Sequence, residues 1–412
     1  MASSATLLLL SPAPDPGTFL VLKDLYGPAL RDVLKKLSSS TTERPGKKIL
    51  EVALPCYHLY GTENLSRSIL YPKTQKLVAG LYKLICVIAA QESINVEDAE
   101  GIDARVLLIA HPGTDSPQIS QVSQEMEGPV ISLSTLALSG RQWHTIYSVD
   151  TELGEEVLKI FLDANISFSN VHKLRSGAVP SSGNKPSGIQ NLALHPVRTH
   201  YSLAVGGTFD HLHIGHKLLL TMFVFALDKA PSSGEEPERS LTVGITGDAL
   251  LKNKKFAEFL ESWERRREST HDFMSSILDF RPPGDRDVKT EETSDPGPNG
   301  HVVKVTFPSK LHIRYVEIWD PFGPTITDES ITALIISAET RSGGKAVNDK
   351  RLEKGWPPLE VLEVDVLDPE DANNESQSDQ ETVETSFQNK LSSTGIRRAQ
   401  SEKANPRPAQ IP

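Results

Sequence analysis

The residues best suited to chemistry lie in one short stretch, residues 204–216, with the sequence Ala-Val-Gly-Gly-Thr-Phe-Asp-His-Leu-His-Ile-Gly-His. An apolar run ends at Val205, a glycine turn follows, and a long apolar helix is expected from His216 to about Asp228. Glycines at a strand end let a ligand approach the backbone closely. The start of the helix offers free N–H groups and the positive end of its dipole to a phosphate. His213 and His216 are three residues apart, so both imidazoles can face oxygens that gain charge during phosphoryl or nucleotidyl transfer. The alternative is a glycine turn with two surface histidines.

A basic turn follows the next expected strand, Leu241–Thr246. It carries Lys252, Lys254 and Lys255, and lysines just after a strand end can reach a triphosphate as point charges. For any single one of these lysines, a solvated surface position is an equally good interpretation.

Polar residues also follow a later expected strand, Ala333–Ser337. Glu339, Thr340 and Arg341 come just past its carboxyl end, and ligands bind at that edge of an open parallel sheet. These residues are therefore candidates for contacts to a substrate.

A second candidate phosphate clamp lies near the end of the chain. Ser392, Ser393 and Thr394 supply hydroxyl and backbone donors, and Arg397 can pair with a phosphate. By itself Ser-Ser-Thr is an ordinary capping sequence. Its value comes from its place, one strand after Glu339.

The order of these motifs resembles a known family. Gly-Gly-Thr-Phe-Asp-x-x-His-x-Gly-His is similar to the signature of the HxGH nucleotidyltransferase superfamily. Together with Asp-Pro-x-Gly-Pro, Ser-x-Glu-Thr-x-x-Gly-Gly and Ser-Ser-Thr-x-x-Arg, it resembles the eukaryotic phosphopantetheine adenylyltransferases over about residues 200–400. The resemblance implies transfer of AMP from ATP to 4′-phosphopantetheine, giving dephospho-CoA and pyrophosphate in coenzyme A biosynthesis. It also implies that Mg²⁺ enters with ATP and has few protein ligands.

The resemblance gives these residues roles. His216, His213 and Lys252 are the expected catalytic residues. Thr208 would position the acceptor phosphate, while His216 and Lys252 or Lys254 would hold the α-phosphate. His213 and the Ser392–Arg397 clamp would hold the β- and γ-phosphates. The expected binding residues are Gly206, Gly207, Thr208, Phe209, Asp210, Lys254, Glu339, Thr340, Arg341, Ser392, Ser393, Thr394 and Arg397.

Two other functions remain open from the residues alone. One is another HxGH enzyme, such as a cytidylyltransferase, and the other is a non-catalytic scaffold of a CoA-synthesising complex. The sequence contains no Gly-x-x-x-x-Gly-Lys-Ser/Thr phosphate loop. We therefore expect a monofunctional, fungal-type enzyme and not one fused to a dephospho-CoA kinase, as in animal relatives. The first half resembles the amino-terminal extension of fungal members.

The predicted fold class is α/β, in two parts. Residues 1–172 alternate strands and helices, which predicts a separate small domain in which we find no catalytic constellation. Residues 173–197 are rich in Gly, Ser and Pro and are expected to form a flexible linker. Residues 198–400 are expected to form a doubly wound, Rossmann-like parallel sheet with the nucleotidyltransferase motifs at one edge.

Three polar segments of the second part are expected to be disordered, because their composition cannot support a core. They are the insertions 282–300 and 369–389 and the tail 401–412.

Composition and net charge indicate the compartment of the protein and the kinds of partner it binds. The formal net charge of −11 over 412 residues argues against a nucleic-acid partner. Cys56 and Cys86 are the two cysteines, which favours free thiols in a reducing compartment. No apolar run is long enough to span a bilayer. We therefore expect a cytoplasmic protein with no membrane partner, whose partners are its two substrates, with other enzymes of CoA biosynthesis as further candidates.

Overall fold

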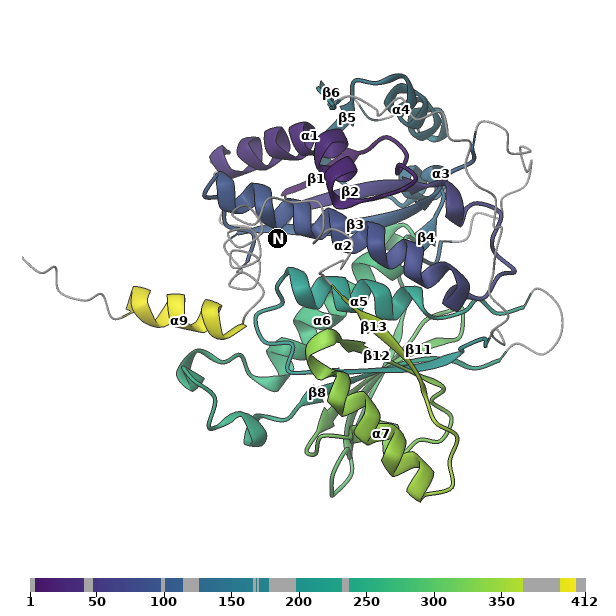
Figure 1. Cartoon of the computed structure of the whole chain (residues 1–412), viewed down its shortest axis with the longest axis vertical. Coiled ribbons are helices and arrows are strands. Elements are labelled where there is room, and N and C mark those ends of the chain that lie inside the picture. The colour runs from purple at the N-terminus through teal and green to yellow at the C-terminus, as the bar shows by residue number, and fades with distance from the viewer. Residues whose placement is uncertain are drawn as a thin grey trace, which may run out of the picture.

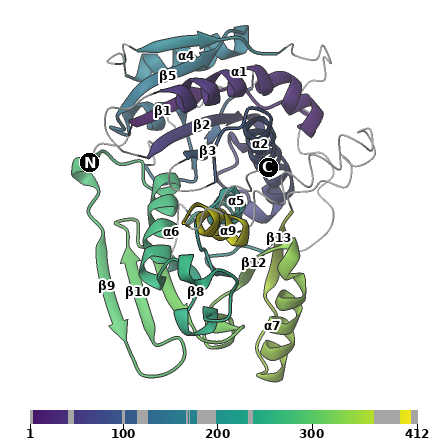
Figure 2. The ribbon, with the colours of Figure 1, turned by 90° about the vertical axis from the view of Figure 1, so that its left-hand side faces the viewer.

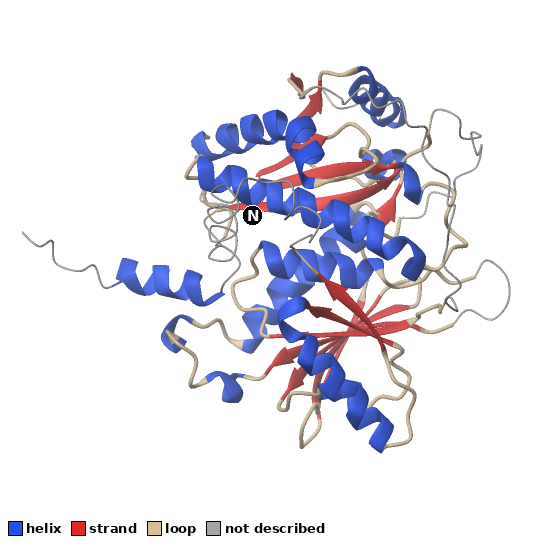
Figure 3. Ribbon diagram, viewed as in Figure 1, coloured by secondary structure: helices blue, strands red, loops and turns tan. Residues whose placement is uncertain are grey.

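The structure, a computed structural model, describes residues 4–40, 47–97, 101–113, 126–165, 168, 170–177, 198–231, 237–365 and 393–404. These residues form an α/β fold with two sheets (Figure 1). Helices lie between the sheets and on their outer faces (Figure 3).

The first sheet has six parallel strands in the order β4-β3-β2-β1-β5-β6. Its strands are β1 (Ser4–Leu9), β2 (Lys48–Cys56), β3 (Ile102–Ala110), β4 (Val130–Ile131), β5 (Trp143–Val149) and β6 (Val171–Leu174). Its helices are α1 (Phe19–Ser39), α2 (Arg67–Gln91), α3 (Leu133–Leu138) and α4 (Glu152–Ala164). This is a doubly wound arrangement, because the strand order changes direction at β1.

The second sheet has seven strands in the order β13-β12-β7-β8-β11-β10-β9. Five are parallel, and β10 and β9 extend one edge as an antiparallel pair. The strands are β7 (Ser202–Gly207), β8 (Arg239–Thr246), β9 (Lys289–Ser294), β10 (His301–Thr306), β11 (Leu311–Ile318), β12 (Ala333–Ser337) and β13 (Glu360–Val364). The helices are α5 (Ile214–Phe225), α6 (Trp263–Leu278), α7 (Arg341–Glu353) and α9 (Ser393–Ala404). The predicted Rossmann-like parallel sheet is therefore confirmed.

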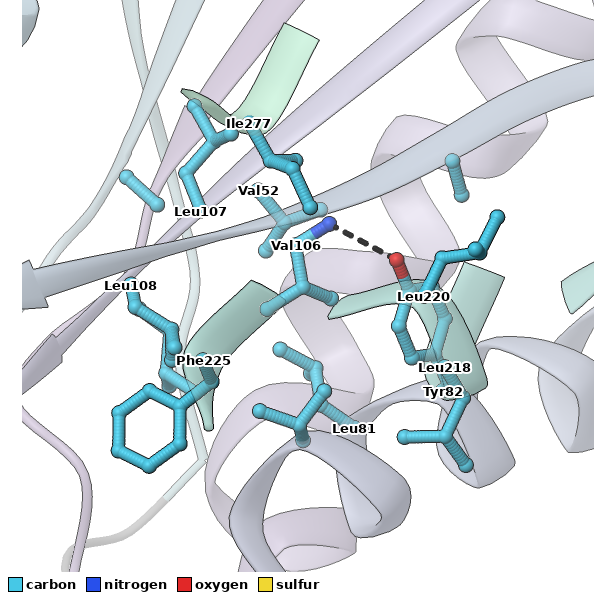
Figure 4. Close-up of a cluster of buried hydrophobic side chains, with 14 of the residues drawn as sticks. Val52, Leu81, Tyr82, Val106, Leu107, Leu108, Leu218, Leu220, Phe225 and Ile277 are labelled. Atoms are coloured by element: carbon cyan, nitrogen blue, oxygen red, sulfur yellow. Dashed lines mark hydrogen bonds between the residues drawn. The ribbon is translucent and has the colours of Figure 1, made fainter. Parts of the chain in front are cut away.

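Helices α2 and α5 join the two halves. Nearly every residue of α5 is buried, and α2 is buried over most of its surface. A helix that is apolar on all faces must be covered on all faces, and these two helices pack against each other between the sheets (Figure 2). Figure 4 shows the result, a single cluster in which Leu81 and Tyr82 of α2 meet Val106 of β3 and Leu218 of α5. The Tyr82 hydroxyl accepts a hydrogen bond of 3.2 Å from the Val106 amide.

The predicted α/β fold in two parts is confirmed, because each half has a sheet of its own. The sheets are distinct, but one continuous hydrophobic cluster runs through both halves. The sequence contained a sign of this, because the apolar residues of α5 are not confined to one face.

The expected boundary at residue 172 also shifts. Strand β6 continues to Leu174, and the Gly177 amide and Ser176 hydroxyl both bond to the Leu25 carbonyl, at 3.0 and 2.8 Å. The first half therefore holds the chain through residue 177. The rest of the expected linker, residues 178–197, lies outside the described residues.

The expectation that residues 282–300 are disordered is wrong. A short 3-10 helix (Pro283–Asp285) is followed by β9, which pairs with β10 from Lys289↔Thr306 to Ser294↔His301. All six side chains of β9 are exposed. An edge strand with no buried face needs no apolar residues, so composition alone could not reveal it.

Of the other two segments expected to be disordered, residues 369–389 lie outside the described residues. Residues 401–404 form the last turn of α9, and residues 405–412 are again outside. Within the ranges that the structure describes, no helix is both long enough and apolar enough to cross a membrane.

We predict that the halves unfold as one unit. Phe225 of α5 is fully buried, with the Tyr71 ring at 6.5 Å and the Arg67 guanidinium at 5.2 Å, both from α2. Phe225→Ala should lower the free energy of unfolding by about 3–5 kcal/mol. Hydrogen exchange should show β2 and β8 losing protection together.

The control is Leu352→Ala, because that side chain is 59% exposed and should change stability by less than about 0.5 kcal/mol. Loss of protection in β8 with β2 unaffected would show that the halves are independent.

Candidate functional site

The candidate site lies at the edge of the second sheet, where β7 and β12 separate. Pairing of β7 with β12 stops at Val205↔Ile335, whereas its pairing with β8 continues to Gly207↔Ile245. Strand β8 continues the sheet on one side of β7, and β12, which comes later in the sequence, lies on the other. This is the topological switch point of the sheet, where a crevice opens at the carboxyl ends of the strands.

A cavity of about 390 Å³ lies at this switch point. Its lining combines strand ends, the turn after β11 and the first turns of α7. Residues that line it include Gly206, Gly207, Thr246, Leu250, Trp319, Asp320, Phe322, Thr340, Gly343 and Gly344. Among the described lining residues Asp320 is the one charged residue, and its carboxylate accepts the amides of Phe322 and Gly323 at 2.7 and 2.8 Å. The cavity therefore offers backbone and apolar surface to a ligand.

Glycines leave this space open. A Cβ added at Gly206 or at Gly343 would meet no atom within 4 Å. At Gly207 an added Cβ would lie 3.1 Å from the Phe209 ring, so that position is filled by the protein itself. Gly206 therefore gives a ligand access to the backbone at the end of β7.

The two imidazoles of the motif are brought together. His213 is the N-cap of α5, and its ring stacks on that of His216 with centroids 3.9 Å apart. The Phe209 ring lies 5.4 Å from the His216 ring. Within the described residues, Nδ1 of each histidine is buried and has no hydrogen-bond partner. Buried polar atoms are nearly always satisfied, so this pair is suited to receive a ligand.

Burial keeps both rings neutral. It lowers the pKa of His216 to about 4, with Asp210 acting in the opposite direction. Burial also lowers the pKa of His213 well below its ordinary value, and His216, Lys217 and His211 lower it further. A neutral imidazole keeps one N–H donor and one acceptor.

Arg266 of α6 organises the loop between β7 and α5, and the sequence analysis gave it no role. Its fully buried guanidinium donates to the Thr208 carbonyl at 2.7 Å, the Thr246 carbonyl at 2.8 Å and the Asp248 carboxylate at 2.6 Å. It therefore ties the start of this loop, just after the glycines of β7, to the end of β8. The sequence held one signal of this burial: Arg266 is spaced so that it shares the buried face of α6 with residues such as Phe273.

Helix α9 docks on the same loop. Asp210 is fully buried; its carboxylate pairs with Arg397 and accepts the Glu261 amide at 3.0 Å. The Ser393 hydroxyl donates to the Asp210 carbonyl at 2.8 Å, and Arg397 donates to the Lys255 carbonyl at 3.1 Å.

Arg397 was expected to face the β- and γ-phosphates, which stays a prediction, and in the structure its guanidinium pairs with Asp210. The physical reason is that a buried carboxylate requires a cation or comparable donors. Thr394 accepts a further bond from Arg397 at 3.2 Å. Ser392 lies outside the described residues.

The remaining predicted residues lie nearer the surface. Thr340 lines the cavity, and its hydroxyl donates to the Ser337 carbonyl at 3.0 Å. Arg341 is exposed and donates to Glu363 of β13 at 2.7 Å. Glu339 is exposed.

Lys252, Lys254 and Lys255 are all exposed. They follow a 3-10 helix (Asp248–Leu251) that comes just after β8, and the geometry does not favour one of them over the others. No group of three or more His, Cys, Asp or Glu residues in the described part of the chain could hold a metal ion.

Comparison with known proteins adds to this geometry. A family model described as a domain of unknown function (DUF8446) matches residues 1–182. An uncharacterized protein of Schizosaccharomyces pombe is 37% identical over 40% of this chain and 40% of its own length. A phosphopantetheine adenylyltransferase of Saccharomyces cerevisiae is 33% identical over 49% of this chain and 50% of its own length. Thus the chain matches half or less of the length of these two relatives.

A phosphopantetheine adenylyltransferase of Thermococcus gammatolerans is 30% identical over 40% of this chain, and the match covers 77% of its length. The doubly wound sheet and its switch-point cavity define a Rossmann-like α/β protein. Within that class, the chain belongs to the phosphopantetheine adenylyltransferase family.

We predict a pH dependence of stability from the imidazole pair. The pKa of His216 is about 4 in the folded protein and about 6.5 in the unfolded chain. As the pH falls below 6.5 the unfolded chain takes up a proton that the folded protein does not, so stability decreases. The slope reaches about 1.4 kcal/mol per pH unit for this group.

Urea unfolding at pH 7, 6 and 5 checks this prediction. His216→Gln should make the decrease shallower by that amount, whereas His172→Gln, at an exposed position, should leave it unchanged. Equal slopes in the wild type and His216→Gln would contradict it.

Proposed function

We propose that this protein is a pantetheine-phosphate adenylyltransferase that transfers AMP from ATP to 4′-phosphopantetheine. The observation that carries the proposal is the stacked pair of neutral imidazoles, each with a buried Nδ1 that has no hydrogen-bond partner among the described residues. The pair lies at the start of α5, just after the strand whose glycines open the cavity. Family membership supplies the substrates, because relatives named phosphopantetheine adenylyltransferase match this chain.

The reaction requires little from the protein beyond alignment of the two substrates and stabilisation of the charge that develops. A phosphate oxygen of 4′-phosphopantetheine attacks the α-phosphorus of ATP, the bond to the β-phosphate oxygen breaks, and pyrophosphate leaves. The second pKa of a phosphate monoester is near 6, so the nucleophile is already ionised at neutral pH. No general base and no covalent enzyme intermediate are required. Catalysis then rests on in-line positioning and on stabilising the charge that develops.

The proposed roles follow the order of the motif. Thr208 positions the acceptor phosphate, and His216 with Lys252 or Lys254 holds the α-phosphate. His213 contacts the β- and γ-phosphates. Mg²⁺ would be carried by the ATP phosphates with few protein ligands.

The terminal segment shares the phosphate contacts. Ser392 and Ser393 contact the β- and γ-phosphates together with His213. Arg397, through its pair with Asp210, holds α9 so that the Ser393 hydroxyl lies at the site.

The cavity suits an uncharged part of a substrate, because its lining is mostly backbone and apolar side chain. Thr340 is at its edge, and Glu339 and Arg341 flank Thr340. We further infer a monofunctional enzyme of fungal type, supported by the likeness to the Saccharomyces cerevisiae relative.

The direct test is pyrophosphate release by the full chain with ATP and 4′-phosphopantetheine, with dephospho-CoA identified by mass spectrometry. CTP in place of ATP separates this activity from that of a cytidylyltransferase. Pantetheine in place of 4′-phosphopantetheine tests whether the phosphate is the nucleophile. Turnover with CTP but not ATP, or none with any nucleotide, would overturn the proposal.

We predict that His216→Ala lowers kcat by roughly 10²–10³-fold, the scale of one lost charge-stabilising donor. The fold should persist, and circular dichroism with thermal unfolding verifies this. His172→Ala, an exposed histidine of the first half, is the matched control and should retain full turnover. Near wild-type kcat in His216→Ala would remove that imidazole from the mechanism.

We also predict that Gly206→Val folds normally but binds substrate poorly. The added methyl groups meet no protein atom near the Cβ position, so they occupy the space a ligand needs. KM for ATP or 4′-phosphopantetheine should rise roughly tenfold, which corresponds to about 1.4 kcal/mol.

Gly27→Ala in α1 is the control, because an added Cβ there also meets nothing within 4 Å but lies far from the motif in the first half. Unchanged KM values in Gly206→Val would show that no substrate approaches this strand end.

A further inference from the structure

A buried ion pair connects the first half of the chain to the first turn of α5. Lys217, the residue after His216, is 4% exposed, and its ammonium group lies 2.5 Å from Oδ1 of Asp103 in β3. Asp103 is 3% exposed. Asp103 lies in a strand of the first sheet and Lys217 lies in a helix of the second half, so the contact crosses between the halves of the fold.

The two oxygens of Asp103 have different partners. Oδ2 accepts from Arg105 at 2.7 Å and lies 3.0 Å from the Lys47 ammonium, and both of these residues belong to the first half. Oδ1 faces Lys217. Arg105 therefore orients the carboxylate from within its own sheet, which leaves the other oxygen to hold α5.

Asp103 and Lys217 support each other's charged forms in this buried cluster. Burial acts to raise the pKa of Asp103, but Lys217, Arg105 and Lys47 together hold it well below its ordinary value. Burial lowers the pKa of Lys217, and Asp103 opposes that change. Without Asp103, burial would favour the neutral form of the Lys217 amine.

Lys217 in turn fixes the imidazole pair. Its backbone amide donates to the His213 carbonyl at 3.0 Å, which closes the first turn of α5. His213 is the N-cap of that turn, and its ring stacks on His216. A shift of Lys217 therefore moves both rings.

We propose that Asp103 is a positioning residue for the nucleotidyltransferase site: by holding Lys217, it sets the first turn of α5 and so the place of both imidazoles. The first half of the chain thus takes part in catalysis through one carboxylate. This inference rests on the proposed function for its kinetic readout. It needs no substrate contact from residues 4–177.

Asp228 offers a contrast at the other end of α5. It is also buried, and its carboxylate accepts the amides of Arg67 and His200, each at 2.6 Å. It therefore also joins α5 to the first half, but it lies just past the end of the helix. General loosening of the junction would affect both aspartates alike, whereas positioning of the imidazoles depends on Asp103.

The experiment compares variants of the full chain by kcat and KM for ATP. Asp103→Asn should lower kcat by roughly 10–100-fold, the scale of a small misplacement of reacting groups. KM for ATP should stay within about threefold, because the lost interaction acts in the transition state. Lys47→Met, which removes a cation from Oδ2 alone, should retain wild-type kcat. Asp228→Asn should lower the melting temperature but not kcat.

A double-mutant cycle tests the connection. Asp103 acts through Lys217, so Asp103→Asn should have no further effect on kcat in a Lys217→Met background. The double variant removes the unpaired buried ammonium group that Asp103→Asn alone leaves at Lys217, so it should fold even where Asp103→Asn does not. It should remain slow, whereas a merely structural pair would regain wild-type kcat along with stability.

A second readout needs no turnover. The pKa of His213, followed by NMR of its ring proton, should rise in Lys217→Met, because a nearby positive charge is lost while His216 and His211 remain. The pKa of His213 should also rise in Asp103→Asn, because burial then favours the neutral form of the Lys217 amine. It should stay unchanged in Lys47→Met and Asp228→Asn.

These outcomes separate the two proposals. If the wild type releases no pyrophosphate, the proposed function fails while the NMR titration still decides the positioning role. A folded Asp103→Asn with wild-type kcat would overturn the inference. So would an equal loss of kcat in Asp228→Asn, an undiminished effect of Asp103→Asn in the Lys217→Met background, or a His213 pKa that does not move.

Discussion

The structure depends on a helix that is buried on every side. Helix α5 carries the imidazole pair at its start, and its apolar faces must be covered by both sheets. Burial of this helix also takes Lys217 out of water, which the fold can sustain only with a charged partner such as Asp103. Breaking a pair of this kind typically costs about 3–5 kcal/mol. The same packing that joins the halves therefore makes the site depend on both.

The loop between β7 and α5 is held from several directions. Phe209 and His211 both have positive φ, at 52° and 46°, and such conformations cost about 1–3 kcal/mol each. Arg266 binds the Thr208 carbonyl, and Glu261 accepts the His211 amide at 2.8 Å. The pair of Asp210 with Arg397 adds α9 to the same loop. These contacts offset the backbone strain, while Nδ1 of His213 and Nδ1 of His216 stay buried without a hydrogen-bond partner among the described residues.

Sequence reasoning succeeded where the signal was local. It predicted a parallel sheet and placed Ala333–Ser337 as a strand, and it put the glycines and histidines of residues 204–216 at one strand end. It failed where two distant residues meet. Asp103 and Lys217 are 114 positions apart, and Asp210 and Arg397 are 187 apart. No local pattern of charge predicts which buried carboxylate will face which cation, because the choice follows from how the sheets and helices pack.

The pairing of Arg397 shows why a motif alone is ambiguous. An arginine after a run of hydroxyl residues suits a phosphate and a buried carboxylate equally well. The choice depends on Asp210, which belongs to the glycine–histidine motif itself and is fully buried. A loop that presented this carboxylate unpaired would bring a negative charge close to the place proposed for the phosphates. Pairing with Arg397 neutralises that charge, so an arginine that pairs with a carboxylate of the loop also makes the site more favourable for an anion.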